Sequence, residues 1–157
     1  MKEEMVFIFL NYIFINYLEY IIHKFSHNKK YGGFLYDSHY IHHYIDHPPE
    51  RLMVKNEHEL NNTQGPYVVV MLSTYVLVYQ ILSFYYFKIF LCMSSLYLYT
   101  INELHNQYHI LDSPLDKYEW FRKRKKLHHL HHIRRNRNFN LVFFTSDKMN
   151  NTFISSQ

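Results

Sequence analysis

Ten of the 13 histidines in this chain fall into four short clusters, and these clusters constrain the fold more than any other feature of the sequence. The clusters are His23 with His27, His39 with His42 and His43, His105 with His109, and His128 with His131 and His132. Residues three or four apart share a face of a helix, so each cluster can direct its imidazoles toward one point. Imidazole is a ligand for iron, zinc, copper and nickel. A fold that brings the four clusters together would therefore surround two metal ions.

The other metal-binding residue types narrow the kind of site. His47 beside Pro48 is expected in a turn, His58 has no ligand spacing, and His129 is expected to point away from the face that holds its cluster. The single cysteine, Cys92, excludes a disulfide framework, a thiolate zinc ribbon and an iron–sulfur cluster. No H-E-x-x-H motif of a metalloprotease occurs. The alternative, ten unrelated polar side chains, does not account for four clusters with ligand spacing.

Two apolar stretches are long enough to cross a bilayer. Residues 5–22 match the ~20 residues that one span needs. We expect an anchor rather than a removable signal peptide, because neither a basic leader nor a small-residue cleavage site accompanies this stretch. Residues 66–101 are too long for one upright span, and Lys88 near their middle predicts the turn of a helical hairpin. Helices are expected because open strands would leave backbone groups unpaired in lipid.

The segments between the apolar stretches are polar and carry the histidine clusters. Gly32-Gly33 is expected to break the first helix, and Pro48-Pro49 to close the segment that follows. Residues 51–64 are charged and expected at the surface. Ser113-Pro114 predicts another break, and residues 120–137 a basic helix bearing the fourth cluster.

Together these features predict an all-α, integral membrane helical bundle with a cytosolic, histidine-rich helical cap that holds a dinuclear metal site. We expect one domain over residues 1–157, with the histidine clusters in 23–43 and 105–132. One span followed by a hairpin places all four clusters on the same side as most Lys and Arg residues. Nine of the 17 lie between Lys117 and Arg137, and the positive-inside rule assigns that side to the cytosol.

The basic stretch does not indicate a nucleic-acid partner. Its histidines have ligand spacing, it follows apolar spans, and it contains no stacking or groove-reading motif. A membrane-embedded metalloenzyme is the interpretation that the composition favours.

The histidine clusters lie in motifs that resemble those of the fatty acid hydroxylase and sterol desaturase superfamily of membrane di-iron proteins. Residues 19–27 (EYIIHKFSH) resemble the family's E-Y-x-x-H-R-x-x-H box, and residues 35–43 (LYDSHYIHH) resemble its second box. Residues 127–132 (LHHLHH), followed by Asn138-Phe139, resemble its last box and the N-[FY]-G after it. The similarity covers roughly residues 15–153.

This resemblance implies a di-iron, oxygen-dependent monooxygenase-type oxidoreductase of the endoplasmic reticulum that hydroxylates, or desaturates, a fatty acyl chain, ceramide or sterol. It implies two iron ions, dioxygen as co-substrate, and electrons from cytochrome b5 or a similar donor, with zinc possible in purified protein. The basic stretch around Lys123 to Lys126 could dock that donor, or could be solvated or face lipid headgroups. The implied metal ligands are His23, His27, His39, His42, His43, His105, His109, His128, His131 and His132. No catalytic residue beyond these ligands is implied.

Four further residues are candidates to orient the imidazoles through hydrogen bonds, namely Glu19, Asp37, His129 and Asp147. Carboxylates also cap helices and solvate loops, so both interpretations stay open.

The closing segment departs from the family pattern. Asn140 and Asn151 stand where the family tends to have Gly, and since Asn tolerates positive φ, both are expected to preserve the turns. Ser146 and Asn150 replace a Trp and a Phe, which removes aromatic packing. These departures favour an alternative, a non-catalytic metal-binding membrane protein derived from the family. The complete set of ten histidines favours the enzyme. Residues 51–54 (RLMV) after His42-His43 resemble the fatty acid and ceramide 2-hydroxylase branch.

Overall fold

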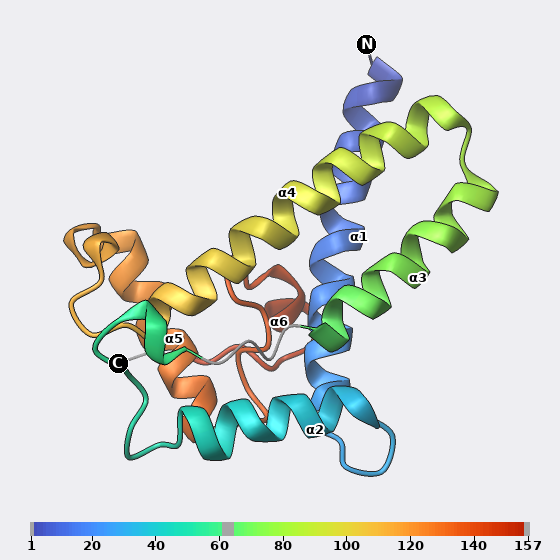
Figure 1. Cartoon of the computed structure of the whole chain (residues 1–157). Coiled ribbons are helices and arrows are strands. Elements are labelled where there is room, and N and C mark those ends of the chain that lie inside the picture. The colour runs from blue at the N-terminus through green and yellow to red at the C-terminus, as the bar shows by residue number, and fades with distance from the viewer. Residues whose placement is uncertain (1, 61–64, 156–157) are drawn as a thin grey trace.

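A computed structural model describes residues 2–60 and 65–155, and these residues form an arm of three apolar helices joined to a histidine-rich cap (Figure 1). The arm contains α1 (Lys2–Ser26), α3 (Gly65–Ile81) and α4 (Phe84–Tyr108). The cap contains α2 (Phe34–Ile41), a π-helical turn (His42–Asp46), α5 (Glu119–Ile133) and α6 (Thr145–Met149). Two 3₁₀ turns, Glu57–Glu59 and Pro114–Lys117, complete the described elements. The described residues contain no β-strand, only a bridge between Val54 and Ile110, so the all-α prediction is confirmed.

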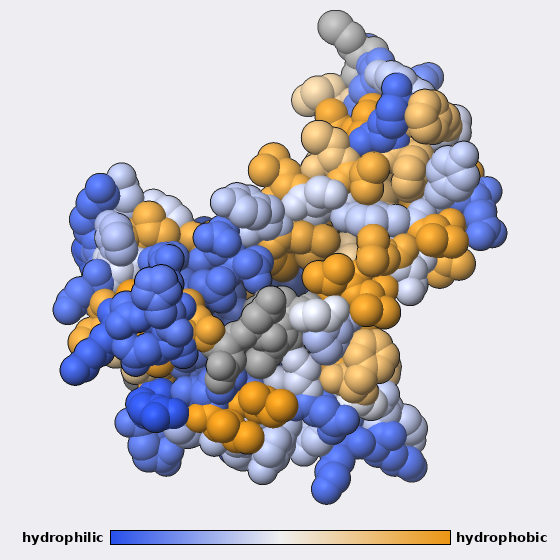
Figure 2. All heavy atoms as spheres, viewed as in Figure 1, coloured by the Kyte–Doolittle hydropathy of each residue, from blue (hydrophilic) through white to orange (hydrophobic). Residues whose placement is uncertain are grey.

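Two helices of the arm, α1 and α4, are long and apolar enough to cross a membrane, and α3 is a shorter apolar helix. Leu72, Val76 and Leu77 on α3 are each more than half exposed. Hydrophobic side chains gather along the arm, whereas hydrophilic ones dominate the end that carries α2 and α5 (Figure 2). Outward-facing apolar side chains over this length are what a lipid-facing surface requires.

The hairpin in the second apolar stretch turns earlier than Lys88. Helix α3 ends at Ile81 and α4 begins at Phe84, so the prediction of a turn at Lys88 is wrong. Lys88 instead lies in the first turns of α4, where its Nζ is 5.0 Å from the centre of the Phe84 ring. A cation over an aromatic face is stabilised by the ring's quadrupole, which lets the helix continue through this charge.

Glycine residues set the turn between the first two histidine clusters. Gly33 has φ 52°, a conformation that side chains other than Gly seldom adopt. At Gly32 an added Cβ would lie 2.7 Å from the carbonyl oxygens of Asn28 and Phe25. Helix α1 ends at Ser26, earlier than the expected break at Gly32-Gly33. The two glycines instead lie in the turn that folds α2 back against the end of α1.

One other expected boundary differs in detail, and one expected surface segment agrees. The basic helix ends at Ile133 rather than Arg137, because the chain must turn back toward α1 through Asn138, which has φ 52°. Residues 51–60 are mostly exposed, as predicted, and the remainder of the charged segment, 61–64, lies outside the described residues.

Replacing Gly32 with Ala should lower the free energy of unfolding by about 1–3 kcal/mol, because backbone oxygens occupy the space that the new methyl group needs. Chemical denaturation in detergent micelles would measure the change. Gly65→Ala is the matched control, since nothing lies within 4 Å of a Cβ there. Equal stability of the two variants would contradict the tight turn.

Candidate metal centre

The ten clustered histidines lie together where the arm meets the cap, in two groups of five. Site A consists of His23, His27, His39, His43 and His131, and site B of His42, His105, His109, His128 and His132. Within each site the ligand nitrogens lie within 4.8 Å of one another. Nine of the ten side chains are buried, and His27 is partly exposed.

Each site draws on three clusters. The first pair, at the end of α1, belongs to site A, and the third pair, at the end of α4, belongs to site B. The two H-x-x-H-H clusters are each divided between the sites. In the cluster at residues 39–43, His42 belongs to site B and the other two histidines to site A. In the cluster at residues 128–132, His131 belongs to site A and the other two histidines to site B. The clusters of α1 and α4 thus each contribute to one site, and the clusters at the end of α2 and on α5 contribute to both.

The two sites are in direct contact through their histidine rings. The rings of His43 and His132 stack with centroids 4.0 Å apart and an interplanar angle of 24°. His131 and His132 are consecutive on α5 and point to different sites. Ions held at the two sites would therefore be close neighbours.

Backbone carbonyls fix the tautomers of several imidazoles. The Nδ1 atoms of His109, His131 and His132 lie 2.7, 2.6 and 2.9 Å from the carbonyl oxygens of Leu52, Arg137 and His47, respectively. His23 makes the same contact with the Phe139 carbonyl. A carbonyl can only accept, so each Nδ1 carries the proton and each Nε2 presents a lone pair to the site.

These lone pairs outnumber the protons that could bridge them by hydrogen bonds. The Nε2 atom of His128 lies 2.8 Å from Nε2 of His109 and 3.1 Å from Nε2 of His132. A neutral His128 has at most one proton on Nε2, so it cannot satisfy both lone pairs. In site A, the buried Nε2 of His23 and both nitrogens of His43 have no hydrogen-bond partner among the described residues.

A metal ion would satisfy these nitrogens. Imidazole nitrogens bind zinc at about 2.0–2.1 Å, so adjacent ligands of one ion lie roughly 3 Å apart when their bonds are near a right angle. The observed spacings of 2.8–3.1 Å between Nε2 atoms match that value. The donor set is all nitrogen, which suits both iron and zinc.

Burial keeps the imidazoles neutral. Burial first, and then the neighbouring histidines, holds the pKa of His39, His43, His128 and His131 well below the ordinary value. Burial, His23 and the positive charge of Arg135 lower the pKa of His27 to about 2. A neutral imidazole is the form that binds metal, so the site has the protonation state that ligation needs.

Two of the carboxylates that could orient imidazoles, Asp37 and Glu19, have no hydrogen bond to a histidine among the described residues. Asp37 is exposed on α2. Glu19 has other partners. Its carboxylate accepts hydrogen bonds from Tyr97 Oη at 2.6 Å, Asn140 Nδ2 at 2.8 Å and the Leu141 amide at 2.8 Å. One helical turn before His23, the side chain meets the returning closing segment instead.

Asp147 supports the site through the backbone. It is fully buried, and its oxygens accept from the amides of Phe139 at 2.9 Å and Asn140 at 2.7 Å and from Thr152 Oγ1 at 2.6 Å. Phe139 is the residue whose carbonyl accepts from His23 Nδ1. Asp147 therefore fixes the acceptor that orients His23 rather than the imidazole itself.

Two histidines outside the clusters lie close to site B. His129 contacts the Tyr108 carbonyl through Nε2 at 2.7 Å, which steadies the chain just before His109. His47 is buried, and its ring stacks on that of His109 at 3.7 Å. Its carbonyl accepts from His132, so the prediction of a simple turn residue missed its place beside the site.

Tyr67 is a partner of the site that sequence reasoning missed. Its hydroxyl lies 3.0 Å from Nδ1 of His39. Tyr67 belongs to α3, and nothing in its spacing from the histidines indicates the contact.

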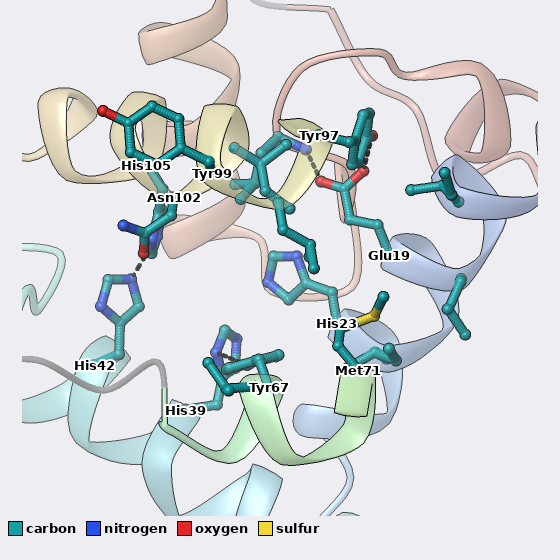
Figure 3. A pocket seen from close by; sticks show the side chains of 17 residues that line it. Glu19, His23, His39, His42, Tyr67, Met71, Tyr97, Tyr99, Asn102 and His105 are labelled. Carbon is teal, nitrogen blue, oxygen red and sulfur yellow. Dashed lines mark hydrogen bonds between the residues drawn. The ribbon is translucent and has the colours of Figure 1, made fainter. Parts of the chain in front are cut away.

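A largely apolar cavity of about 300 Å³ adjoins the two sites. Residues of α1, α3 and α4 line it, among them Ile15, Met71 and Leu98. His23 and His39 of site A and His42 and His105 of site B face it (Figure 3). The cavity therefore brings an apolar molecule against imidazoles of both sites.

The closing segment replaces aromatic packing with hydrogen bonds. Ser146 is buried and its Oγ donates to Asn16 Oδ1 at 2.8 Å, while Asn150 Nδ2 donates to the Ser146 carbonyl at 2.8 Å. Asn151 has φ 56°, as predicted for a residue that replaces Gly. The second such residue is Asn138 and not Asn140, because the carboxylates of Glu19 and Asp147 already hold Asn140 in place.

Comparison with known proteins identifies one similarity. Residues 8–152 match the family model described as fatty acid hydroxylase, a range that includes every residue of sites A and B. No curated protein and no solved structure matches the chain.

Replacing Asp147 with Asn should lower the free energy of unfolding by about 1.5–3 kcal/mol, because an amide cannot accept from all the donors that the carboxylate serves. Asp37→Asn, at an exposed position, should stay within about 0.5 kcal/mol of the native protein. Denaturant titration of both variants in micelles would measure the difference. An Asp147 variant as stable as the Asp37 variant would show that the closing segment does not depend on this carboxylate.

Proposed function

The chain belongs to the fatty acid hydroxylase family, and from that membership we propose that it is a membrane-bound, oxygen-dependent oxidoreductase that hydroxylates, or desaturates, a lipid. The observation that carries the proposal is the apolar cavity, which is walled on one side by imidazoles of both histidine groups. An apolar chain in that cavity would lie against the proposed metal centre. The substrate is a fatty acyl chain, a ceramide or a sterol.

The proposed cofactors are two iron ions, one at each site, although purified protein could carry zinc because imidazole suits both. When bound, iron would supply the activation of dioxygen that breaks an unactivated C–H bond, which no amino-acid side chain can do. The chain's own residues hold the ions, orient the lipid and keep water away. Backbone carbonyls behind the histidines and Tyr67 behind His39 fix the ligand geometry.

The cavity wall indicates how a lipid would reach the centre. Val68 on α3 and Tyr99 on α4 line the cavity and are 54% and 66% exposed. A lipid moving laterally between these two helices would enter the cavity without crossing water. The polar end of the protein, which carries α2 and α5, lies away from this entrance. The reacting carbon of the lipid would therefore be in an apolar environment.

Cytosolic orientation, in the endoplasmic reticulum, is part of the proposal. Nine of the 17 Lys and Arg residues lie between Lys117 and Arg137, in and around α5, at the same end as both histidine groups. The positive-inside rule places such an end on the cytosolic side. A one-electron donor such as cytochrome b5 would meet the centre there.

The alternative is a metal-binding protein of this family without catalytic activity. The replacement of two aromatic residues by Ser146 and Asn150 favours it. The convergence of all ten histidines, together with the retained cavity beside them, favours the enzyme.

The test uses the full chain in nanodiscs, loaded with ferrous iron and supplied with a chemical reductant, ¹⁸O₂ and a mixture of fatty acids, ceramides and sterols. We expect a lipid that carries ¹⁸O, or an unsaturated lipid without label, detected by mass spectrometry. Bound iron with no oxygen-dependent product would favour the non-catalytic alternative.

Filling the cavity should strongly reduce product formation without loss of metal. Met71→Trp places a larger side chain into the cavity, since Met71 is buried and lines it, and we expect product formation to fall about tenfold or more because the lipid is displaced from the centre. Leu72→Trp is the control, because the neighbouring Leu72 is 57% exposed on the same helix. Equal activity of both variants would place the substrate elsewhere.

A further inference from the structure

A second depression reaches site A from the polar side of the molecule. This basic basin has a volume of about 620 Å³. Four cations line it, Lys24, Lys29, Lys30 and Arg135, and no Asp or Glu does. Its floor includes three ligands of site A, namely His27, His39 and His43.

The basin and the apolar cavity approach site A from different directions. His39 is the residue that lines both. His27 is the one clustered histidine that is partly exposed, and it lines the basin but not the apolar cavity. A molecule in the basin would therefore come close to site A without entering the space proposed for the lipid.

The charges of the basin are available to a partner. Among the described residues, no carboxylate pairs with Lys24, Lys29, Lys30 or Arg135, and all four side chains are exposed. The basic run on α5 differs. Lys123 pairs with Glu119 at 2.6 Å, and the buried Lys125 pairs with Asp116 at 2.8 Å. The positive potential of α5 is thus partly neutralised by its own neighbours.

The rim of the basin has the composition of a protein interface. Tyr40 and Tyr44 are each about two-fifths exposed, and their rings stack at 4.5 Å. The guanidinium of Arg135 lies 4.3 Å from the centre of the Tyr44 ring. Tyrosine and arginine are enriched among residues that dominate protein–protein binding. Tyr40 lies on α2 and Tyr44 on the π-helical turn after it. Helix α2 lies at the opposite end of α1 from its N-terminus (Figure 1), beyond the apolar arm.

We propose that the basic basin is the docking site of an acidic one-electron donor protein, and that electrons enter at site A past His27. This inference rests on the proposed function, which needs a reductant. A C–H bond, dioxygen, two electrons and two protons yield C–OH and water. Two successive dockings supply the two electrons, and at each docking one ferrous donor haem is oxidised to ferric. Docking at the basin, rather than on α5, follows from the unpaired charges and the nearness of His27.

The test measures binding of the acidic haem domain of cytochrome b5 to the full chain in nanodiscs of neutral lipid. Lys29→Glu with Lys30→Glu reverses two exposed charges of the basin, and Lys123→Glu with Lys126→Glu makes the same change of net charge on α5. Metal content confirms that each variant is folded. We expect the dissociation constant to rise about tenfold or more for the basin variant at low ionic strength, about twofold or less for the α5 variant, and the difference to shrink in high salt.

Several results would overturn the proposal. Equal weakening by both variants would show a nonspecific charge effect, and weakening by the α5 variant alone would place the donor on α5. Loss of binding to vesicles of anionic lipid by the basin variant, with unchanged donor affinity, would assign the basin to lipid headgroups.

Stopped-flow oxidation of the reduced haem domain separates this proposal from the proposed function. Slower oxidation in the basin variant, with no lipid product from any form, would support docking and refute the hydroxylase. Normal product formation with a chemical reductant, together with unchanged haem oxidation in the basin variant, would refute docking and leave the hydroxylase standing.

Discussion

The structure depends on one electrostatic constraint, the convergence of unprotonated imidazole nitrogens in a buried space. Backbone carbonyls hold protons on the outer nitrogens of His109, His131 and His132, so their inner nitrogens present lone pairs. Lone pairs that face one another without donors are unfavourable in a low-dielectric interior. A cation at each site would remove that cost. Because each site takes ligands from three clusters, the same cations would hold the ends of α1 and α4 against the cap.

The closing segment supplies the second set of constraints. Glu19 and Asp147 lie on different elements, and both accept hydrogen bonds from residues 139–141. The turn they hold presents the Phe139 carbonyl to His23. Ser146 and Asn150 stand where the family pattern has aromatic residues. Ser146 joins this hydrogen-bonded region through Asn16, and Asn150 joins it through the Ser146 carbonyl. The departure from the family pattern thus exchanges apolar packing for polar contacts in the part of the chain that orients a site A histidine.

Features with a sequence period could be predicted, and features that depend on distant backbone could not. Residues three and four apart share a helix face, so the internal arrangement of each histidine cluster follows from spacing. The apolar stretches likewise identify the helices of the arm. The division of His42 from His43 depends on where the histidines of α4 and α5 lie around the π-helical turn, and no local pattern carries that information. Tyr67 reaches His39, and Glu19 reaches Asn140, across sequence separations that only the folded chain closes. The sequence predicts a turn at His47 but does not show that the ring of His109 lies beside it.

The central claim is that the ten histidines form two metal sites. Its most direct test is the metal content per chain of protein purified from iron-supplemented cells, for the native chain and two double variants. His27→Ala with His39→Ala removes two ligands of site A, and His105→Ala with His109→Ala removes two of site B. We expect about two ions in the native chain and about one in each variant, since the unmodified site keeps its five nitrogens. Native levels of metal in both variants, or no metal in the native chain, would contradict the claim.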